Sequence, residues 1–237
     1  MQYYALVEEW PVESMIFFRE LPGCFSSAPT YEEALKNLPA AISIYLSWLK
    51  KNDITIVEDD GSGFSVVVKE RLAAIDGQKG PRFEADLPAP DEVEIDTALN
   101  VAAAARAELL ELYEGVPERD RERVPHPGQW SLTQHLTHVV ETEAWYASRL
   151  MDAPSANPGP KLQSDVSMAL FDNAMDVELL LRGLSPEQCQ RVFLHDGEEW
   201  TAAKVLRRMV QHLREHYPWM REIARAADTK GNRQEEA

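Results

Sequence analysis

The stretch that decides the fold is Thr201–Ala227, which reads TAAKVLRRMVQHLREHYPWMREIARAA. Its apolar residues recur every three or four positions, which predicts an amphipathic helix with one buried face. That face carries Val205, Met209, Trp219 and Ile223. His212 and His216 stand four residues apart and fall on the same face, so both imidazoles can point at a single ion.

Two histidines on an apolar face need partners, because burying an unpartnered polar group is costly. Taken alone, the pair fits ordinary core or surface histidines as well as it fits a metal site. An earlier stretch, Ser131–Met151, is also helical in pattern and supplies His135 and His138. One of these with His212 and His216 would make a three-imidazole site. Such a site suits zinc, nickel or iron(II) and leaves a position open for water or substrate.

Helical patterns fill the second half of the chain. Ser131-Leu132-Thr133-Gln134 is a capping box that predicts the start of one helix. Four helices are expected, at 98–112, 131–151, 165–182 and 201–227. Helices of this length joined by loops favour an antiparallel four-helix bundle.

The first 75 residues instead predict a small α+β unit. Strand-like runs at 3–10, 14–20, 54–57 and 64–68 surround a helix that begins at the capping box Thr30–Glu33 and contains Pro39. A Pro- and Gly-rich acidic stretch then separates the two parts. The expected organisation is an α+β domain at 1–75, a linker at 76–95, an all-α bundle at 96–228 and a disordered tail at 229–237.

Composition narrows the function classes. The 237 residues are 44% hydrophobic and 27% charged, which is typical of a folded protein. A formal net charge of −16 argues against nucleic-acid binding, and Arg207-Arg208 is interpreted as a solvated helix face. Two distant cysteines provide no disulfide framework or paired-cysteine zinc motif. Neither a signal peptide nor a membrane span is recognised, so a cytoplasmic protein without membrane association is expected.

Two motifs of the second half resemble the DinB/YfiT-like family over about residues 96–227. They are Gly128-Gln129-Trp130-Ser131, followed by His138, and Glu199-Trp200-Thr201, followed by His212 and His216. The resemblance implies a four-helix bundle, commonly dimeric, that binds one divalent cation through His138, His212 and His216. His135 would be a second-shell or structural residue, and Trp130 and Trp200 would pack the ends of the bundle.

The same resemblance implies a metal-dependent enzyme, either a transferase that uses a low-molecular-weight thiol or a hydrolase. Its small-molecule substrate is unknown, and no catalytic residue or general base is assigned. Glu141 and Glu143 follow His138 on the same helix, where either could orient a ligand, but a surface position is expected for both. Pro218 should kink or widen the last helix, which would either tilt His216 away from the ion or open the pocket above it.

The N-terminal unit resembles the HicB-like antitoxin core over about residues 2–70. The motif is Glu20-Leu21-Pro22-Gly23-Cys24-Phe25, followed by the helix start at Thr30–Leu35. Such a unit would be a scaffold or dimerisation module, or would capture a protein partner such as a small toxin. It supports an alternative function, that of a non-catalytic binding protein that dimerises through the bundle. Cys24 is expected to be a small buried hydrophobic residue.

Overall fold

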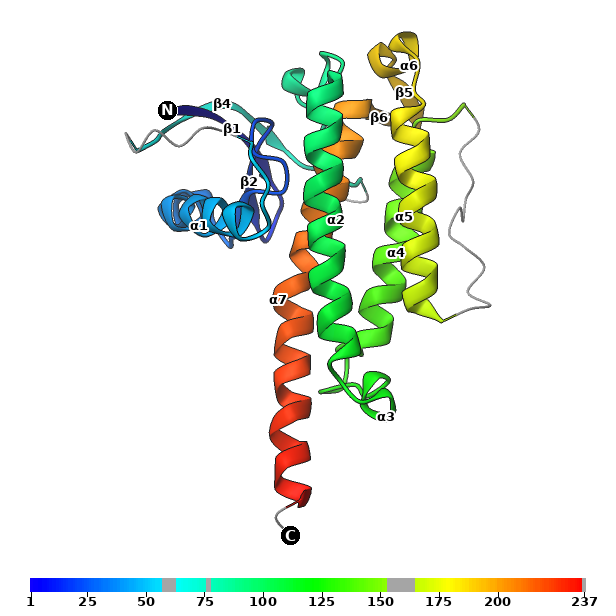
Figure 1. The fold of residues 1–237 in the computed structure, drawn as a ribbon. Coiled ribbons are helices and arrows are strands. Elements are labelled where there is room, and N and C mark those ends of the chain that lie inside the picture. Colours follow the sequence, from blue (N-terminus) through cyan, green and yellow to red (C-terminus); the bar gives the residue numbers. More distant parts are fainter. Residues whose placement is uncertain (57–62, 76–77, 153–164, 236–237) are drawn as a thin grey trace.

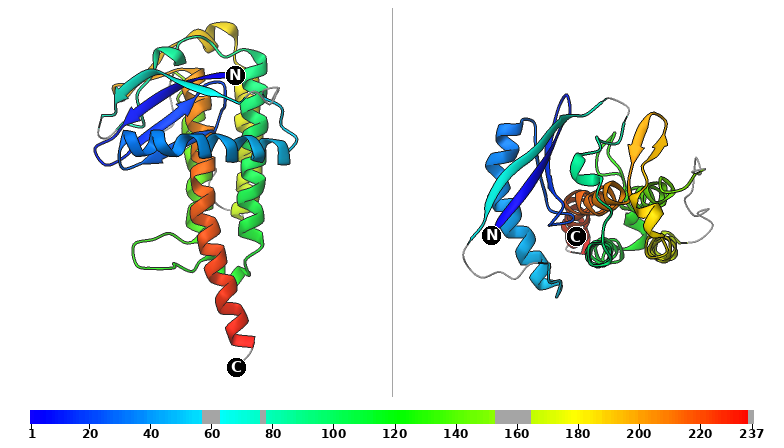
Figure 2. Two further views of the ribbon diagram at one scale, coloured as in Figure 1. Left: turned by 90° about the vertical axis from the view of Figure 1, so that its left-hand side faces the viewer. Right: turned by 90° about the horizontal axis from the view of Figure 1, so that it is seen from above.

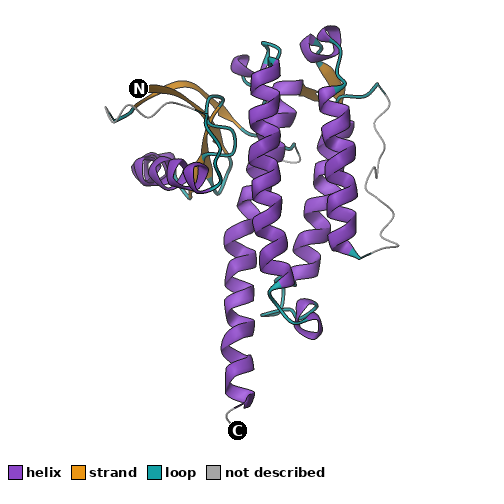
Figure 3. Cartoon of the chain, in the orientation of Figure 1, coloured by secondary structure: helices purple, strands orange, loops and turns teal. Residues whose placement is uncertain are grey.

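The computed structural model describes residues 1–56, 63–75, 78–152 and 165–235, with side chains of the last helix described through residue 227. A mixed unit of one helix and a sheet lies against the side of a bundle of long helices (Figures 1 and 3). The sequence favours a turn at residues 59–63 and a loop at residues 154–160, and of these residues only Gly63 is among those described.

The N-terminal sheet has four strands in the order β3-β2-β1-β4. Strands β1 (Gln2–Glu9), β2 (Ser14–Phe18) and β3 (Phe25–Ala28) form an antiparallel meander. β4 (Ser65–Ala73) returns parallel to β1, after the chain has crossed through helix α1 (Tyr31–Lys51). Both faces of the central strand β2 are buried.

Side chains that alternate along the strands divide between two cores, as the period of two dictates. One face of the sheet packs on the apolar stripe of α1, at Ala34, Leu38, Ile42, Tyr45 and Leu49. The other face packs on Phe83, which lies in the segment that leads to the bundle, and contributes Leu6, Met15 and Phe17. The sheet therefore lies between α1 and the connection to the bundle.

The bundle consists of α2 (Glu92–Glu114), α4 (Leu132–Ser148), α5 (Val166–Arg182) and α7 (Ala202–Glu235). Contacts between α2 and α7, α7 and α4, α4 and α5, and α5 and α2 close the four helices into a ring. Viewed along the bundle, α7 and α2 face the N-terminal unit, and α1 runs crosswise to them (Figure 2). The expected α+β unit followed by a helical bundle is confirmed at this level.

The helix starts follow the caps that the sequence contains. Thr30 accepts a hydrogen bond from the amide of Glu33, and Ser131 and Gln134 form the reciprocal capping box at the start of α4. Asp91 and Glu94 form a second box that starts α2 at Glu92. The end of the predicted linker, at residues 92–95, is therefore helical, because this acidic pair satisfies the free amides of the first turn.

Several short elements were not predicted from the sequence. They are β3, the 3-10 turn η1 (Glu84–Asp86), α3 (Glu118–Arg121), α6 (Pro186–Gln190) and the hairpin β5 (Phe193–His195) with β6 (Glu198–Trp200). The strand expected at 54–57 is wrong for residues 54–56, which belong to no strand, and Val57 lies outside the described residues. α7 continues as a helix to Glu235, so the tail expected from 229 is helical over most of its length, and Glu236 and Ala237 are outside the described residues.

Arg207 does not lie on a solvated helix face, as its charge had suggested, but anchors the connecting segment to both parts. Its guanidinium donates to Glu8 of β1 at 2.9 Å and to Asp86 of η1 at 2.9 Å, and its side chain is 6% exposed. Arg208 is also buried against Glu8, at 3.2 Å. Part of the stretch predicted as an interdomain linker is thus packed against α7, and buried apolar side chains of both parts form one continuous cluster. The division into two domains at 76–95 stays a prediction.

Gly23 allows the turn between β2 and β3 to approach α7 closely. Its φ is +82°, and a Cβ there would lie 2.7 Å from Val210 Cγ1 and 2.9 Å from Arg214 Cδ. A side chain at this position would therefore be strained in its backbone and would collide with α7. None of the described helices is long and apolar enough to cross a lipid bilayer.

Candidate metal centre

Three imidazoles meet where α4 crosses α7. His212 and His216 lie one turn apart on α7, and His138 faces them from α4. The Nε2 atom of His212 lies 3.1 Å from Nε2 of His138 and 3.2 Å from Nε2 of His216. Donor atoms of all three residues lie within 4.8 Å of one another. The structure therefore brings together the three histidines that the sequence singled out.

The positions of the three nitrogens suit coordination of a cation better than hydrogen bonds among the three imidazoles. Each of these contacts could be a hydrogen bond only if one nitrogen carried the proton, and His212 Nε2 has a single proton for two neighbours. A ring nitrogen carries either one proton or one in-plane lone pair, so only one of the two contacts can be a good hydrogen bond. A divalent cation accepts all three lone pairs. Tetrahedral zinc with bonds of about 2.0–2.1 Å holds its ligand nitrogens about 3.3 Å apart, close to the separations here.

His135 contacts His216 on the side of its ring that faces away from the cluster. Its Nδ1 lies 2.9 Å from Nδ1 of His216, so His216 turns one nitrogen to His135 and the other to the cluster. Such a hydrogen bond fixes the orientation and tautomer of a ligand imidazole. His138 has a weaker neighbour, the Thr142 hydroxyl, at 3.4 and 3.5 Å from its two ring nitrogens. Nδ1 of His212 is buried and has no hydrogen-bond partner among the described residues.

Burial keeps these imidazoles neutral at physiological pH. It lowers the pKa of His135 to about 4 and that of His216 to about 3. Burial also lowers the pKa of His138 and takes that of His212 well below 6.5. Only the neutral imidazole has a lone pair for a cation, so the environment prepares the ligands for binding.

Two tryptophans form an aromatic wall at the cluster. Trp130 is 41% exposed, and its ring centroid lies 4.8 Å from that of His138 and 5.3 Å from that of His135. Trp219 is 52% exposed and lies 5.4 Å from the His216 ring. The contact of Trp130 with the clustered histidines was not predicted from the sequence. Ser131 caps α4, which begins at Leu132, and so brings Trp130 beside the first turns of that helix.

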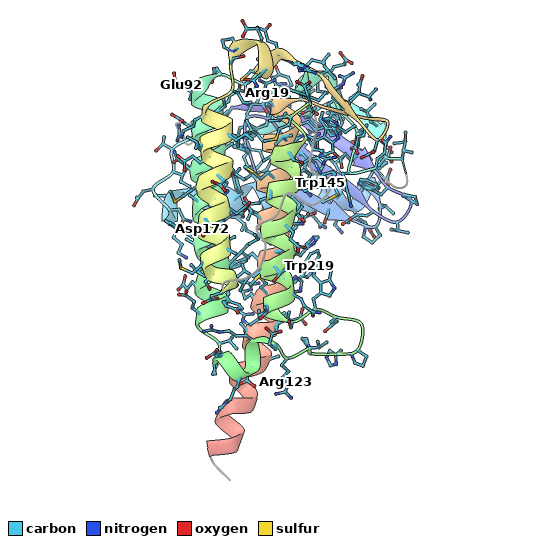
Figure 4. All side chains as sticks on the ribbon, turned by 90° about the vertical axis from the view of Figure 1, so that its right-hand side faces the viewer. Arg19, Glu92, Arg123, Trp145, Asp172 and Trp219 are labelled. Atoms are coloured by element: carbon cyan, nitrogen blue, oxygen red, sulfur yellow. The ribbon has the colours of Figure 1, made fainter. Side chains whose placement is uncertain are left out.

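Both tryptophans also line a cavity of about 430 Å³ beside the cluster. His135 and Glu222 contribute to its wall, together with the loop that precedes α4. This loop projects from the side of the bundle where Trp219 lies (Figure 4). None of the three imidazoles lines this cavity, but Trp130 contacts His138, and His135 and Trp219 contact His216.

The remaining candidates lie elsewhere. Glu141 is exposed as expected, but Glu143 is fully buried and accepts hydrogen bonds from Arg106 at 2.7–3.0 Å. The surface position expected for Glu143 is wrong, because a carboxylate paired with a guanidinium can be buried. His195 lies on β5, and its ring contacts the carbonyl of Arg149 at 3.1 Å. Trp200 is 1% exposed and packs against Trp145 and Tyr146 of α4.

Pro218 does not remove His216 from the cluster. α7 is continuous through it, and His216 keeps its contact with His212 at 3.2 Å. Pro218 lines a different cavity, between α1 and α7. The expected tilt of His216 away from the cluster is therefore not seen, and Pro218 does not line the cavity beside Trp130.

We expect the metal-free protein to lose stability as the pH falls from 6.5 toward 4. The folded-state pKa values of His135 and His216 lie below the value of about 6.5 in an unfolded chain, so the unfolded chain takes up protons first. Equilibrium unfolding with a chelator near pH 7.5 and near pH 5 measures the loss. It should be smaller in His216→Asn, and an equal loss in both proteins would contradict the assigned burial.

The structure is therefore a four-helix bundle in which histidines from two helices, α4 and α7, converge. Residues 102–220, half of the chain, match the DinB superfamily. The chain belongs to this superfamily. The match does not extend to residues 2–70, so the HicB-like resemblance of the N-terminal unit stays a prediction.

Two solved structures from Bacillus subtilis are similar to the chain. The DinB-like protein YjoA is 16% identical, and the match covers 54% of this chain and 90% of YjoA with a TM-score of 0.48. YfiT, described as a probable metal-dependent hydrolase with an unusual four-helix bundle topology, is 20% identical. Its match covers 64% of this chain and 94% of YfiT with a TM-score of 0.48. No curated protein matches the chain.

Proposed function

We propose that the chain binds one divalent cation through His138, His212 and His216 and uses it as the centre of an enzyme that acts on a small molecule. The observation that carries the proposal is the convergence of three neutral Nε2 atoms, with two separations of 3.1 and 3.2 Å. Zinc, nickel and iron(II) all accept such a set of imidazoles.

Three protein ligands and an open position are typical of catalytic rather than structural metal sites. His138 and His212 are only partly buried, so the cluster has a side that solvent can reach. Trp130 and Trp219 shield the neighbouring side and provide apolar surface for a substrate. His135 holds His216 in the orientation that the cluster needs.

A bound divalent cation would supply a nucleophile near neutral pH by lowering the pKa of a coordinated water or thiol. This role needs no carboxylate base, and Glu143, the buried carboxylate of α4, is held by Arg106 and is not available as one. Hydrolysis and transfer to a low-molecular-weight thiol are the two reaction types that this arrangement supports.

Loading the protein with cobalt(II) tests whether the site is open, because cobalt(II) reports its ligands through its absorption spectrum. Addition of 2-mercaptoethanol should produce a sulfur-to-metal charge-transfer band if a thiol enters the coordination shell, and ethylene glycol serves as the matched hydroxyl control. A cobalt spectrum that no added ligand or change of pH alters would identify a closed, structural site. That result would contradict an enzyme.

A further inference from the structure

A second cavity, of about 550 Å³, lies between α1 and the helices α2 and α7. It is lined by residues of all three helices and of the turn at Gly23–Phe25, and by none of the clustered histidines. In Figure 2 this is the region where α1 crosses α7 and α2. The cavity is thus built by the contact between the N-terminal unit and the bundle, and it is separate from the candidate metal centre.

Arg214 of α7 projects into this cavity with its hydrogen-bond donors unused. Its Cζ lies 4.0 Å from the ring centroid of Trp48 and 5.0 Å from that of Tyr45. The two rings are stacked at 5.8 Å with an interplanar angle of 20°. Among the described residues no acceptor contacts this guanidinium, and its Nε is buried without a partner.

The aromatic rings contact the guanidinium but offer no acceptors for its N–H groups. A cation over a ring face is attracted to the π-system, yet the N–H groups lie in the plane of the guanidinium and point past the rings. The free edge is therefore a rigid fork of donors. Such a fork matches the paired oxygens of a carboxylate or a phosphate.

The charges around the cavity favour an anion although the whole chain carries a net charge of −16. Arg214, Lys51 and Arg221 contribute three cations to the lining, against the single carboxylate of Glu108. Glu108 is already engaged, since it accepts from Trp48 Nε1 at 2.7 Å and lies 3.7 Å from Lys51 Nζ. Glu108 lies near enough to act on Arg214 electrostatically, but it makes no direct ion pair with the guanidinium.

Ser47 and Tyr217 add two hydroxyl groups to the lining. An apolar part comprises Phe25, Ala41, Ile44, Ala105, Leu213 and Pro218. Cys24 at the inner end is buried, and burial raises the pKa of its thiol to about 12, so it is a neutral wall residue. We propose that this cavity binds a small organic oxyanion, a carboxylate or phosphate monoester on an apolar or aromatic body, with Arg214 as its anchor.

Isothermal titration of the full chain with benzoate, phenyl phosphate and benzylamine tests the proposal. Both anions should bind with one site per chain, and the one that binds more tightly identifies the oxyanion group. Benzylamine has the same ring and should not bind. The titrations are made with chelator present and repeated in His212→Ala, where binding should persist because the anchor is independent of the metal centre. If neither benzoate nor phenyl phosphate binds the folded protein, the proposal is wrong.

Three variants separate recognition from structure. Arg214→Met should weaken anion binding by about tenfold or more, as expected for a lost charge-assisted pair. Lys51→Met, at an exposed position on the rim, should weaken binding several-fold without affecting the fold. Glu108→Gln keeps an acceptor for Trp48 and removes the competing charge, so it should strengthen binding. Unchanged affinity in Lys51→Met and Glu108→Gln would contradict the assignment even if Arg214→Met does not fold.

Discussion

His212→Ala should abolish the binding of one equivalent of divalent cation. The Nε2 atom of His212 is the central member of the cluster, 3.1 Å from His138 and 3.2 Å from His216. Its loss leaves two imidazoles and opens a side of the site to water. Since even the outer partners of metal ligands contribute about 10–100-fold to affinity, removal of a ligand should cost more than about 100-fold. Metal analysis after dialysis and competition with a chromophoric chelator measure the change.

His195→Ala is the matched control. His195 lies on the β5–β6 hairpin and is hydrogen-bonded to the backbone carbonyl of Arg149 at the end of α4. It belongs to no cluster of potential metal ligands among the described residues. The variant should retain the metal content and affinity of the unmodified chain. If His212→Ala also retained both, the cation would be bound elsewhere and the proposed centre would be wrong.

Arg207→Leu should lower the free energy of unfolding by about 3–5 kcal/mol, the usual cost of breaking a buried ion pair. The guanidinium bridges Glu8 and Asp86, whose side chains are 0% and 4% exposed. Leucine fills part of the space but leaves both carboxylates in the interior with fewer donors. Urea unfolding followed by tryptophan fluorescence measures the loss.

Arg182→Leu makes the same chemical change at the surface. Arg182 pairs with Asp96 and Glu178, but its side chain is 43% exposed, so the expected loss is about 0–1 kcal/mol. A loss of similar size in the two variants would show that the network around Arg207 does not join the sheet, the connecting segment and α7.

The sequence predicted the bundle because its helices are long and regular. A capping box at Ser131 and an apolar stripe along α7 are local signals, and the two histidines four residues apart need only helical geometry to share a face. The prediction that His138 joins His212 and His216 required the family resemblance, because local sequence patterns do not indicate which helices are neighbours. The geometry of all three agrees with that resemblance, whereas their binding of a metal remains a proposal.

Features that depend on distant contacts were missed. Arg207 was interpreted as solvated because its partners, Glu8 and Asp86, lie more than a hundred residues earlier in the chain. The contact of Trp130 with His138 was not predicted, because it depends on the path of the loop before α4. Arg214 carries no local signal, since its free edge exists only where α1 meets α7.

The part that the N-terminal unit plays in function stays a prediction. A HicB-like scaffold, capture of a protein partner and dimerisation through the bundle are each compatible with a sheet whose α1 crosses the helices. The cavity beside Arg214 gives this unit a role of its own, because α1 contributes the two rings that hold the guanidinium. Anion binding at that site would make the contact between the two parts functional as well as structural.

X-ray absorption spectroscopy of the chain loaded with one equivalent of zinc tests the central claim most directly. We predict about three imidazole nitrogens at about 2.0–2.1 Å, with the outer-shell scattering of histidine rings, and loss of this pattern in His212→Ala. A first shell of oxygen atoms without imidazole scattering, or an unchanged spectrum in the variant, would contradict the account.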